Sequence, residues 1–202
     1  MTAEPLPQPK QSAVPDWLIP PEDGFTAEDF LRMAALPPHS ELIDGSLVFV
    51  SPQRSFHSLA MYLLEHGLRR TAPEDLRVRR EMSVVLGPRQ CPEPDLLLVR
   101  AEAVGGSEET HYAAADVVLA AEVVSPDSET RDRERKPQLY AAAGIPHFWR
   151  VERSPEDGRP VVYVYERDPA TRAYGLTGIH HDRLRLTVPF GIDVDLTGID
   201  RL

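Results

Sequence analysis

The stretch VVLAAEVVSPDSETRDRERKPQLY, residues 117–140, decides the fold and raises a question of charge. Seven of its first eight residues are apolar, which predicts a strand buried on both faces in the middle of a sheet. Glu122 interrupts this run, and a buried carboxylate is costly unless a positive charge meets it. Lys136 lies on a helix predicted over residues 132–143, which could begin later because Pro137 is best tolerated in a first helical turn. Either this lysine or a metal ion could supply the positive charge.

The composition indicates one globular domain and excludes several classes of protein. The 202 residues suffice for one sizeable core and are too few for two full domains. No apolar run approaches the roughly 18 residues that span a bilayer, and the N-terminus lacks the features of a signal peptide. Cys91 is the only cysteine, which excludes an internal disulfide, so we expect a cytoplasmic protein without a membrane segment. The net charge of −10 argues against sequence-independent binding of nucleic acid, but it is compatible with a local basic surface.

Local patterns predict an α/β fold that follows an extended arm. Residues 1–23 contain six prolines and few apolar residues, so we expect a flexible arm, followed by a single domain over residues 24–202. Asp44-Gly45, a favoured pair in two-residue turns, lies between two apolar segments and predicts a β-hairpin. The other predicted elements are a short helix starting at Thr26, a helix over residues 54–70, strands over residues 76–86, 95–99 and 147–152, and short antiparallel strands towards the C-terminus.

Three acids interrupt or border apolar strand segments. Glu41 opens the predicted hairpin, Asp95 follows Pro94 and precedes LLLV, and Glu122 lies inside its own strand. Carboxylates gathered at one end of a sheet repel one another unless a divalent cation neutralises them, and oxygen ligands suit Mg²⁺ or Mn²⁺. Each acid also has a structural interpretation. Glu41 could be a surface acid, Asp95 a turn residue, and Glu122 one half of a structural ion pair.

The order of these residues resembles the signature of the PD-(D/E)xK nuclease superfamily. Pro94-Asp95 corresponds to its PD and Glu122 to its second acid, whereas the position of the usual strand lysine is taken by Val124. The run EVVSPDSETRDRERKPQLYAAAGIPHFWRVE is similar to one branch of that superfamily, the Uma family of restriction endonucleases, in which the lysine lies on the following helix. Lys136 matches that lysine.

The resemblance to the Uma family extends over residues 26–199. Tyr140 matches a tyrosine one helical turn after the lysine, and ELIDGSLV, Ser51-Pro52 and His57 match the N-terminal pattern of the family. The resemblance implies a restriction-endonuclease-like α/β fold. In that fold a central mixed sheet is flanked by helices, and here antiparallel strands would be added at the C-terminus.

The resemblance also implies metal-assisted hydrolysis of DNA phosphodiester bonds. Asp95 and Glu122, helped by the carbonyl of Val123, would hold Mg²⁺ or Mn²⁺, and Glu41 would hold a second ion or a metal-bound water. Lys136 would orient the nucleophile or stabilise the phosphate. The candidate catalytic residues are therefore Asp95, Glu122 and Lys136. His57 and Tyr140 are candidates to support them.

Several arginines and histidines are weaker candidates for function. Arg131, Arg133 and Arg135 flank the lysine and are the candidates for contacts with DNA phosphates. The arginines at positions 69, 70, 77, 79 and 80 fit a solvated, salt-bridged surface better than a DNA-binding patch. The segment 180–182, with the sequence HHD, fits a solvated loop better than a metal site.

Three functions are compatible with these features. The first is a Mg²⁺-dependent endonuclease acting on DNA, as a homodimer because cutting both strands favours two sites. The second is a catalytically silent module for binding or assembly, which the acidic net charge and the missing strand lysine favour. The third is a metal-dependent hydrolase of smaller phosphate esters.

Overall fold

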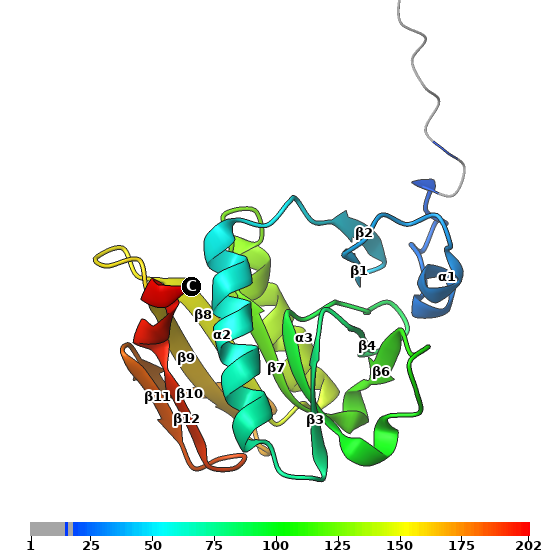
Figure 1. Cartoon of the computed structure of the whole chain (residues 1–202). Coiled ribbons are helices and arrows are strands. Elements are labelled where there is room, and N and C mark those ends of the chain that lie inside the picture. The colour runs from blue at the N-terminus through cyan, green and yellow to red at the C-terminus, as the bar shows by residue number, and fades with distance from the viewer. Residues whose placement is uncertain (1–14, 16–17) are drawn as a thin grey trace, which may run out of the picture.

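The computed structural model describes Pro15 and residues 18–202, and its centre is a six-stranded mixed sheet with helices on both faces (Figure 1). The strand order is β10-β9-β8-β7-β5-β3, in which β7 and β8 are parallel and all other neighbours are antiparallel. Most of the arm predicted over residues 1–23 lies outside the described residues. The strands of the sheet are β3 (Leu76–Arg80), β5 (Leu96–Arg100), β7 (Val117–Val123), β8 (His147–Arg153), β9 (Pro160–Arg167) and β10 (Tyr174–His180).

Strand β7, which contains Glu122, lies in the interior of this sheet, as its apolar sequence predicts. It has β5 on one side and β8 on the other. Its side chains alternate between two hydrophobic cores because successive residues of a strand point to opposite faces. Leu119 and Ala121 belong to one core and Ala120 to the other. Glu122 therefore faces the same side as Ala120.

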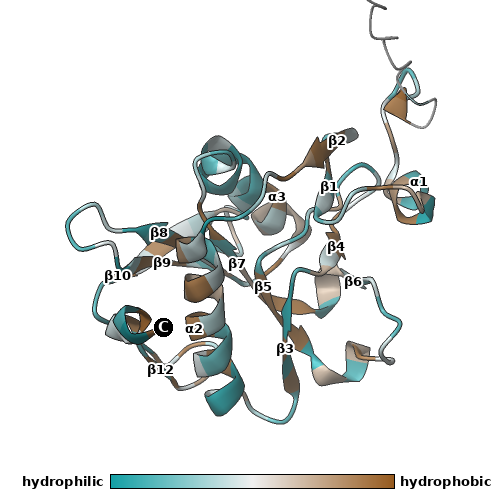
Figure 2. Ribbon diagram, turned by 45° about the horizontal axis from the view of Figure 1, so that its top comes forward, coloured by the Kyte–Doolittle hydropathy of each residue, from teal (hydrophilic) through white to brown (hydrophobic). Residues whose placement is uncertain are grey.

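The helices α2 (Ser55–Thr71) and α3 (Lys136–Ala143) cover the two faces of the sheet. Helix α2 contributes Met61, Leu64 and Leu68 to the first core, and the segment of α3 contributes Tyr140 to the second. Figure 2 shows hydrophobic residues along the strands and hydrophilic residues along the loops and outer turns. The sheet with helices on both faces confirms the predicted fold class.

Three two-stranded units surround the central sheet. The strands β1 (Ser40–Ile43) and β2 (Ser46–Phe49) form the predicted hairpin, and both turn residues have the positive φ angles of a type I′ turn, 54° at Asp44 and 77° at Gly45. The hairpin of β11 (Arg183–Leu186) and β12 (Ile192–Asp195) packs beside α2. Gly67 allows this close approach, because a Cβ atom there would lie 2.4 Å from Val194.

The prediction of one strand over residues 76–86 is wrong. Glu81 has a left-handed backbone, with φ of 52°, and separates β3 from β4 (Ser83–Val85). Strand β4 leaves the central sheet and pairs in parallel with β6 (His111–Ala113), for which the sequence predicted no strand. This unit lies beside the β1–β2 hairpin in Figure 1.

The helices predicted to start at Thr26 and to cover residues 132–143 both form, but the second begins with a π-helical turn. Thr26 caps α1 (Ala27–Arg32) in a capping box with Asp29. The helix predicted over residues 132–143 begins with a π-helical turn, Arg131–Arg135, and Pro137 lies in the first turn of α3. Gly144, with φ of 95°, ends it. None of the helices in the described part of the chain is long and apolar enough to cross a membrane.

Candidate active site

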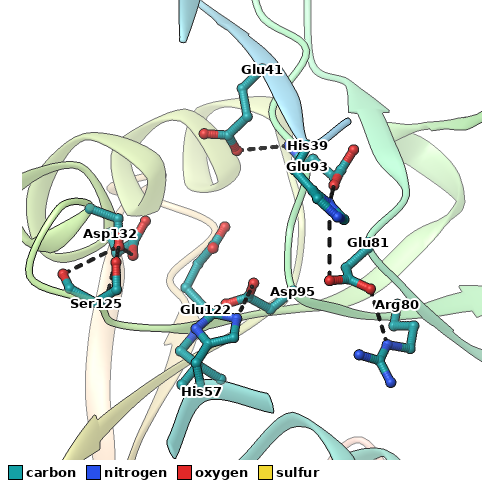
Figure 3. Close-up of polar contacts among 12 residues, drawn as sticks. His39, Glu41, His57, Arg80, Glu81, Glu93, Asp95, Glu122, Ser125 and Asp132 are labelled. Carbon is teal, nitrogen blue, oxygen red and sulfur yellow. Dashed lines mark hydrogen bonds and ion pairs between the residues drawn. The ribbon is translucent and has the colours of Figure 1, made fainter. Parts of the chain in front are cut away.

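Strands β5 and β7 bring Asp95 and Glu122 to the same end of the sheet. Leu96 pairs with Ala121 in antiparallel register, so one step further Asp95 stands opposite Glu122. The backbone N–H of Val123 donates a hydrogen bond of 2.6 Å to Asp95 Oδ2, which holds this carboxylate against β7. Figure 3 shows the two carboxylates beside one another. The structure thus joins two acids that the sequence singled out separately.

Helix α3 carries the two groups that contact Glu122. Lys136 Nζ lies 3.0 Å from Glu122 Oε2, and the hydroxyl of Tyr140 donates a hydrogen bond to Oε1. Both side chains are buried. Pro137 does not prevent this contact, because a missing N–H is tolerated in the first turn of a helix. In the structure as described, Lys136 is therefore the positive charge that meets Glu122.

Glu41 reaches the same site from the β1–β2 hairpin. Its Oε1 lies 2.8 Å from Lys136 Nζ and accepts a hydrogen bond of 2.9 Å from the backbone N–H of Glu93. The hairpin is fastened to the body by two backbone hydrogen bonds between Leu42 and Cys91. Glu41 is only 2% exposed, so the interpretation as a surface acid is wrong.

Asp132 also belongs to the site, although its sequence context did not indicate this. Its Oδ1 lies 3.4 Å from Lys136 Nζ, and its Oδ2 accepts a hydrogen bond from the hydroxyl of Ser128. The side chain is 2% exposed. Asp132 precedes Lys136 by four residues in the sequence, and this spacing places two side chains on the same face of a helix. The spacing is therefore the feature of the sequence that could have identified Asp132.

His57 supports Asp95 from the first turn of α2. Its Nε2 lies 3.0 Å from Asp95 Oδ1, although the angle is not that of a hydrogen bond, and neither ring nitrogen has a hydrogen-bond partner in the described part of the chain. Burial lowers the pKa of this imidazole, but the carboxylate of Asp95 outweighs burial, so the pKa of His57 is raised. The imidazole is thereby biased towards the charged form, which pairs with Asp95.

The buried cluster contains more acid than base. Burial raises the pKa of Glu122 well above its usual range, against the effect of Lys136, and burial likewise raises the pKa of Asp132. Burial lowers the pKa of Lys136, but Glu122, Glu41 and Asp132 together outweigh it and shift that pKa well upwards. Three carboxylates thus surround one ammonium. The cluster therefore favours either bound protons or an additional cation.

A cavity of about 30 Å³ lies between these side chains, large enough for a water molecule or a small ion. No three His, Cys, Asp or Glu side chains among the described residues form a ready-made set of metal ligands. Mg²⁺ often takes only one or two carboxylates and completes its shell with waters, and Asp132 Oδ1 has no hydrogen-bond partner. The lining therefore fits a hydrated divalent cation. The acids that line the cavity are Glu41, Glu81, Glu93, Asp95, Glu122 and Asp132.

The three arginines proposed for DNA contacts have different surroundings. Arg131 lines the cavity. Arg133 is paired with Glu129 and, at 2.5 Å, with Glu152, while Arg135 is paired with Asp44 on the hairpin. Such half-exposed ion pairs contribute little to stability and can exchange partners. They leave both guanidiniums available to another anion.

Comparison with known proteins gives a family and a solved structure of related fold. A model of the family Uma2, described as "Putative restriction endonuclease", matches residues 27–197. A solved structure of a putative nuclease belonging to DUF820 from Anabaena variabilis ATCC 29413 superposes with a TM-score of 0.67 and 16% sequence identity, covering 87% of this chain and 97% of that one. At this identity the likeness shows a shared fold. Among curated proteins, none matches the chain.

Proposed function

Because the chain belongs to the Uma2 family of putative restriction endonucleases, we propose that it is a Mg²⁺- or Mn²⁺-dependent endonuclease that hydrolyses phosphodiester bonds in DNA. The observation that carries this proposal is the convergence of Asp95 and Glu122, from adjacent strands, on an acid-lined cavity next to Lys136. A structural ion pair needs one carboxylate for one ammonium, whereas three surround Lys136 here. A surplus of buried carboxylates is expected where a protein holds a divalent cation.

The acids Glu41, Asp95, Glu122 and Asp132 have different proposed roles in binding the cation. Asp95 and Glu122 would hold the cation together with the carbonyl of Val123, while Glu41 would hold a second ion or a bound water. Asp132 would add one more oxygen, because its Oδ1 is free of hydrogen bonds. A bound divalent cation lowers the pKa of a water molecule and neutralises charge on the phosphate.

The remaining side chains orient these acids and the substrate. Tyr140 holds one oxygen of Glu122, and His57 with the N–H of Val123 holds the carboxylate of Asp95. Lys136 would donate a hydrogen bond to the attacking water or to a phosphate oxygen. Its raised pKa keeps it charged at neutral pH, so it acts as a donor and not as a base.

Contacts with DNA would come from the helix that carries the lysine. Arg131, Arg133 and Arg135 precede Lys136, and DNA phosphates would replace the acids that now pair with the latter two arginines. We propose a homodimer, since two sites are needed to cut both strands in one binding event.

The proposal is tested by incubating supercoiled and single-stranded DNA with purified protein and Mg²⁺ or Mn²⁺. We expect cleavage that requires the cation and that Asp95→Ala abolishes, which also excludes a contaminating nuclease. The exposed acid Glu108 provides a matched control, and Glu108→Ala should cleave as the wild type does. Absence of cleavage of both substrates by the wild type would contradict the proposal.

A catalytically silent module is the second candidate. The observation in its favour is that Lys136 already makes close contacts with Glu41 and Glu122, so the cluster could serve stability alone. In that case substitutions of Lys136 would change the melting temperature, and no cation-dependent cleavage would be measurable in any variant.

A further inference from the structure

A second pocket lies on the other side of His57 from the acid-lined cavity. Its volume is about 210 Å³, and His57 lines both spaces, so the pocket adjoins the candidate active site. Phe56 comes from the first turn of α2, whereas Val124 and Pro126 come from the segment directly after β7. None of these three residues is needed for the roles proposed above.

The floor of this pocket is apolar and fixed in place. Phe56 packs against the first hydrophobic core, to which α2 contributes, so its ring is held in place. The backbone N–H of Val124 donates a hydrogen bond of 2.8 Å to the carbonyl of Val151, which extends the pairing of β7 with β8. A fixed apolar surface of this kind stacks well against a flat aromatic ring.

The rim of the pocket carries positive charge that is free to bind an anion. Arg54 and Arg153 are exposed, and within the described residues neither has an acidic group within 4.0 Å. The lining contains three arginines, Arg54, Arg133 and Arg153, against two acids, Glu129 and Glu152. The rim is therefore positive next to an acidic cavity.

We propose that this pocket binds one unpaired nucleotide next to the scissile phosphate. The base would stack on Phe56 and Pro126, and Arg54 and Arg153 would contact the flanking phosphate. A paired nucleotide cannot bind in this way because its neighbours stack on both of its faces, so the nucleotide comes from a single strand or is turned out of a duplex. This inference rests on the proposed function, and it specifies the form of DNA that the site accepts.

The test is a binding measurement without cleavage. Fluorescence anisotropy in EDTA compares three labelled DNAs of one sequence: a single strand, a perfect duplex, and a duplex with one bulged nucleotide. We expect the single strand and the bulged duplex to bind about tenfold more tightly than the perfect duplex. The double variant Arg54→Gln/Arg153→Gln should lose this preference, whereas Arg100→Gln, which removes an exposed arginine distant in sequence from the pocket, should keep it.

Substitution of the floor gives an independent measurement. Phe56→Leu keeps an apolar side chain on α2 but removes the aromatic ring, so it should weaken binding of the single strand more than binding of the perfect duplex. Equal affinity of the wild type for the bulged and perfect duplexes, or a preference that the double variant retains, would overturn the subsite. Because neither binding measurement requires hydrolysis, a failed cleavage assay would count against the nuclease activity and not against this pocket.

Discussion

The part of Lys136 in catalysis can be separated from any part in DNA binding. We expect Lys136→Ala to reduce the cleavage rate by about 10²- to 10³-fold with little change in DNA affinity, because the ammonium acts on the transition state. Lys136→Arg should also cleave poorly, since a planar guanidinium is larger than the space between Glu41 and Glu122. Single-turnover rates and anisotropy measure the two effects. Wild-type cleavage by Lys136→Arg would contradict the role assigned to this residue.

Substitution of Glu122 tests cation binding independently of catalysis. At a Mg²⁺ or Mn²⁺ concentration about 100-fold above the dissociation constant, binding stabilises the folded protein by about 2.7 kcal/mol, which raises the melting temperature. Glu122→Gln should abolish this rise, whereas Glu108→Gln on the exposed loop should retain it. Differential scanning fluorimetry with and without the cation gives the result. An equal rise in Glu122→Gln would place the cation elsewhere.

The β1–β2 hairpin is the element that determines whether Glu41 is present in the site. The backbone of Cys91 is hydrogen-bonded to Leu42 of this hairpin. Cys91 is fully buried, and burial raises the pKa of its thiol to about 12. At pH 8 the thiol therefore stays protonated and protected, and we expect alkylation only when the hairpin opens. Leu42→Ala should accelerate labelling and weaken cleavage together. Rapid labelling of the native wild type, followed by mass spectrometry, would contradict this description of the hairpin.

Elements with strong local signals were predicted correctly from the sequence. The apolar run around Glu122 predicted the central strand, and Asp44-Gly45 predicted the hairpin. The break at Glu81 was missed because nothing in its neighbourhood marks a left-handed residue there. The strand His111–Ala113 was missed because it is only three residues long and pairs with β4, which is distant in sequence.

The site was predicted less completely than the fold. The acids at positions 41, 95 and 122 were singled out from their strand contexts, but their approach to one another depends on pairing that sequence does not reveal. Asp132 was missed because a charged residue among arginines is typical of an exposed helical turn, whereas this side chain is buried beside Lys136. The ion pairs of Arg133 and Arg135 likewise involve partners from other elements.

The central sheet of the molecule ends in two edge strands, β3 and β10. On β10 the apolar residues Leu176 and Ile179 are 51% and 47% exposed. Exposed apolar residues on an open edge favour pairing with another strand, so we propose that the homodimer forms here. Sedimentation should give twice the chain mass, and Leu176→Lys/Ile179→Lys should give the monomer. A wild-type monomer at micromolar concentration would contradict this prediction.

The order in which the site residues occur along the chain has a consequence for the cell that makes the protein. Glu41 leaves the ribosome long before Lys136, and β8, which completes the pairing of β7, is made after both. An unfinished chain therefore has the acids without Lys136, or has Lys136 before β8 is there to pair with β7. If the chain is the nuclease proposed here, its site can be complete only after β8 has been made, so the activity would appear late in translation.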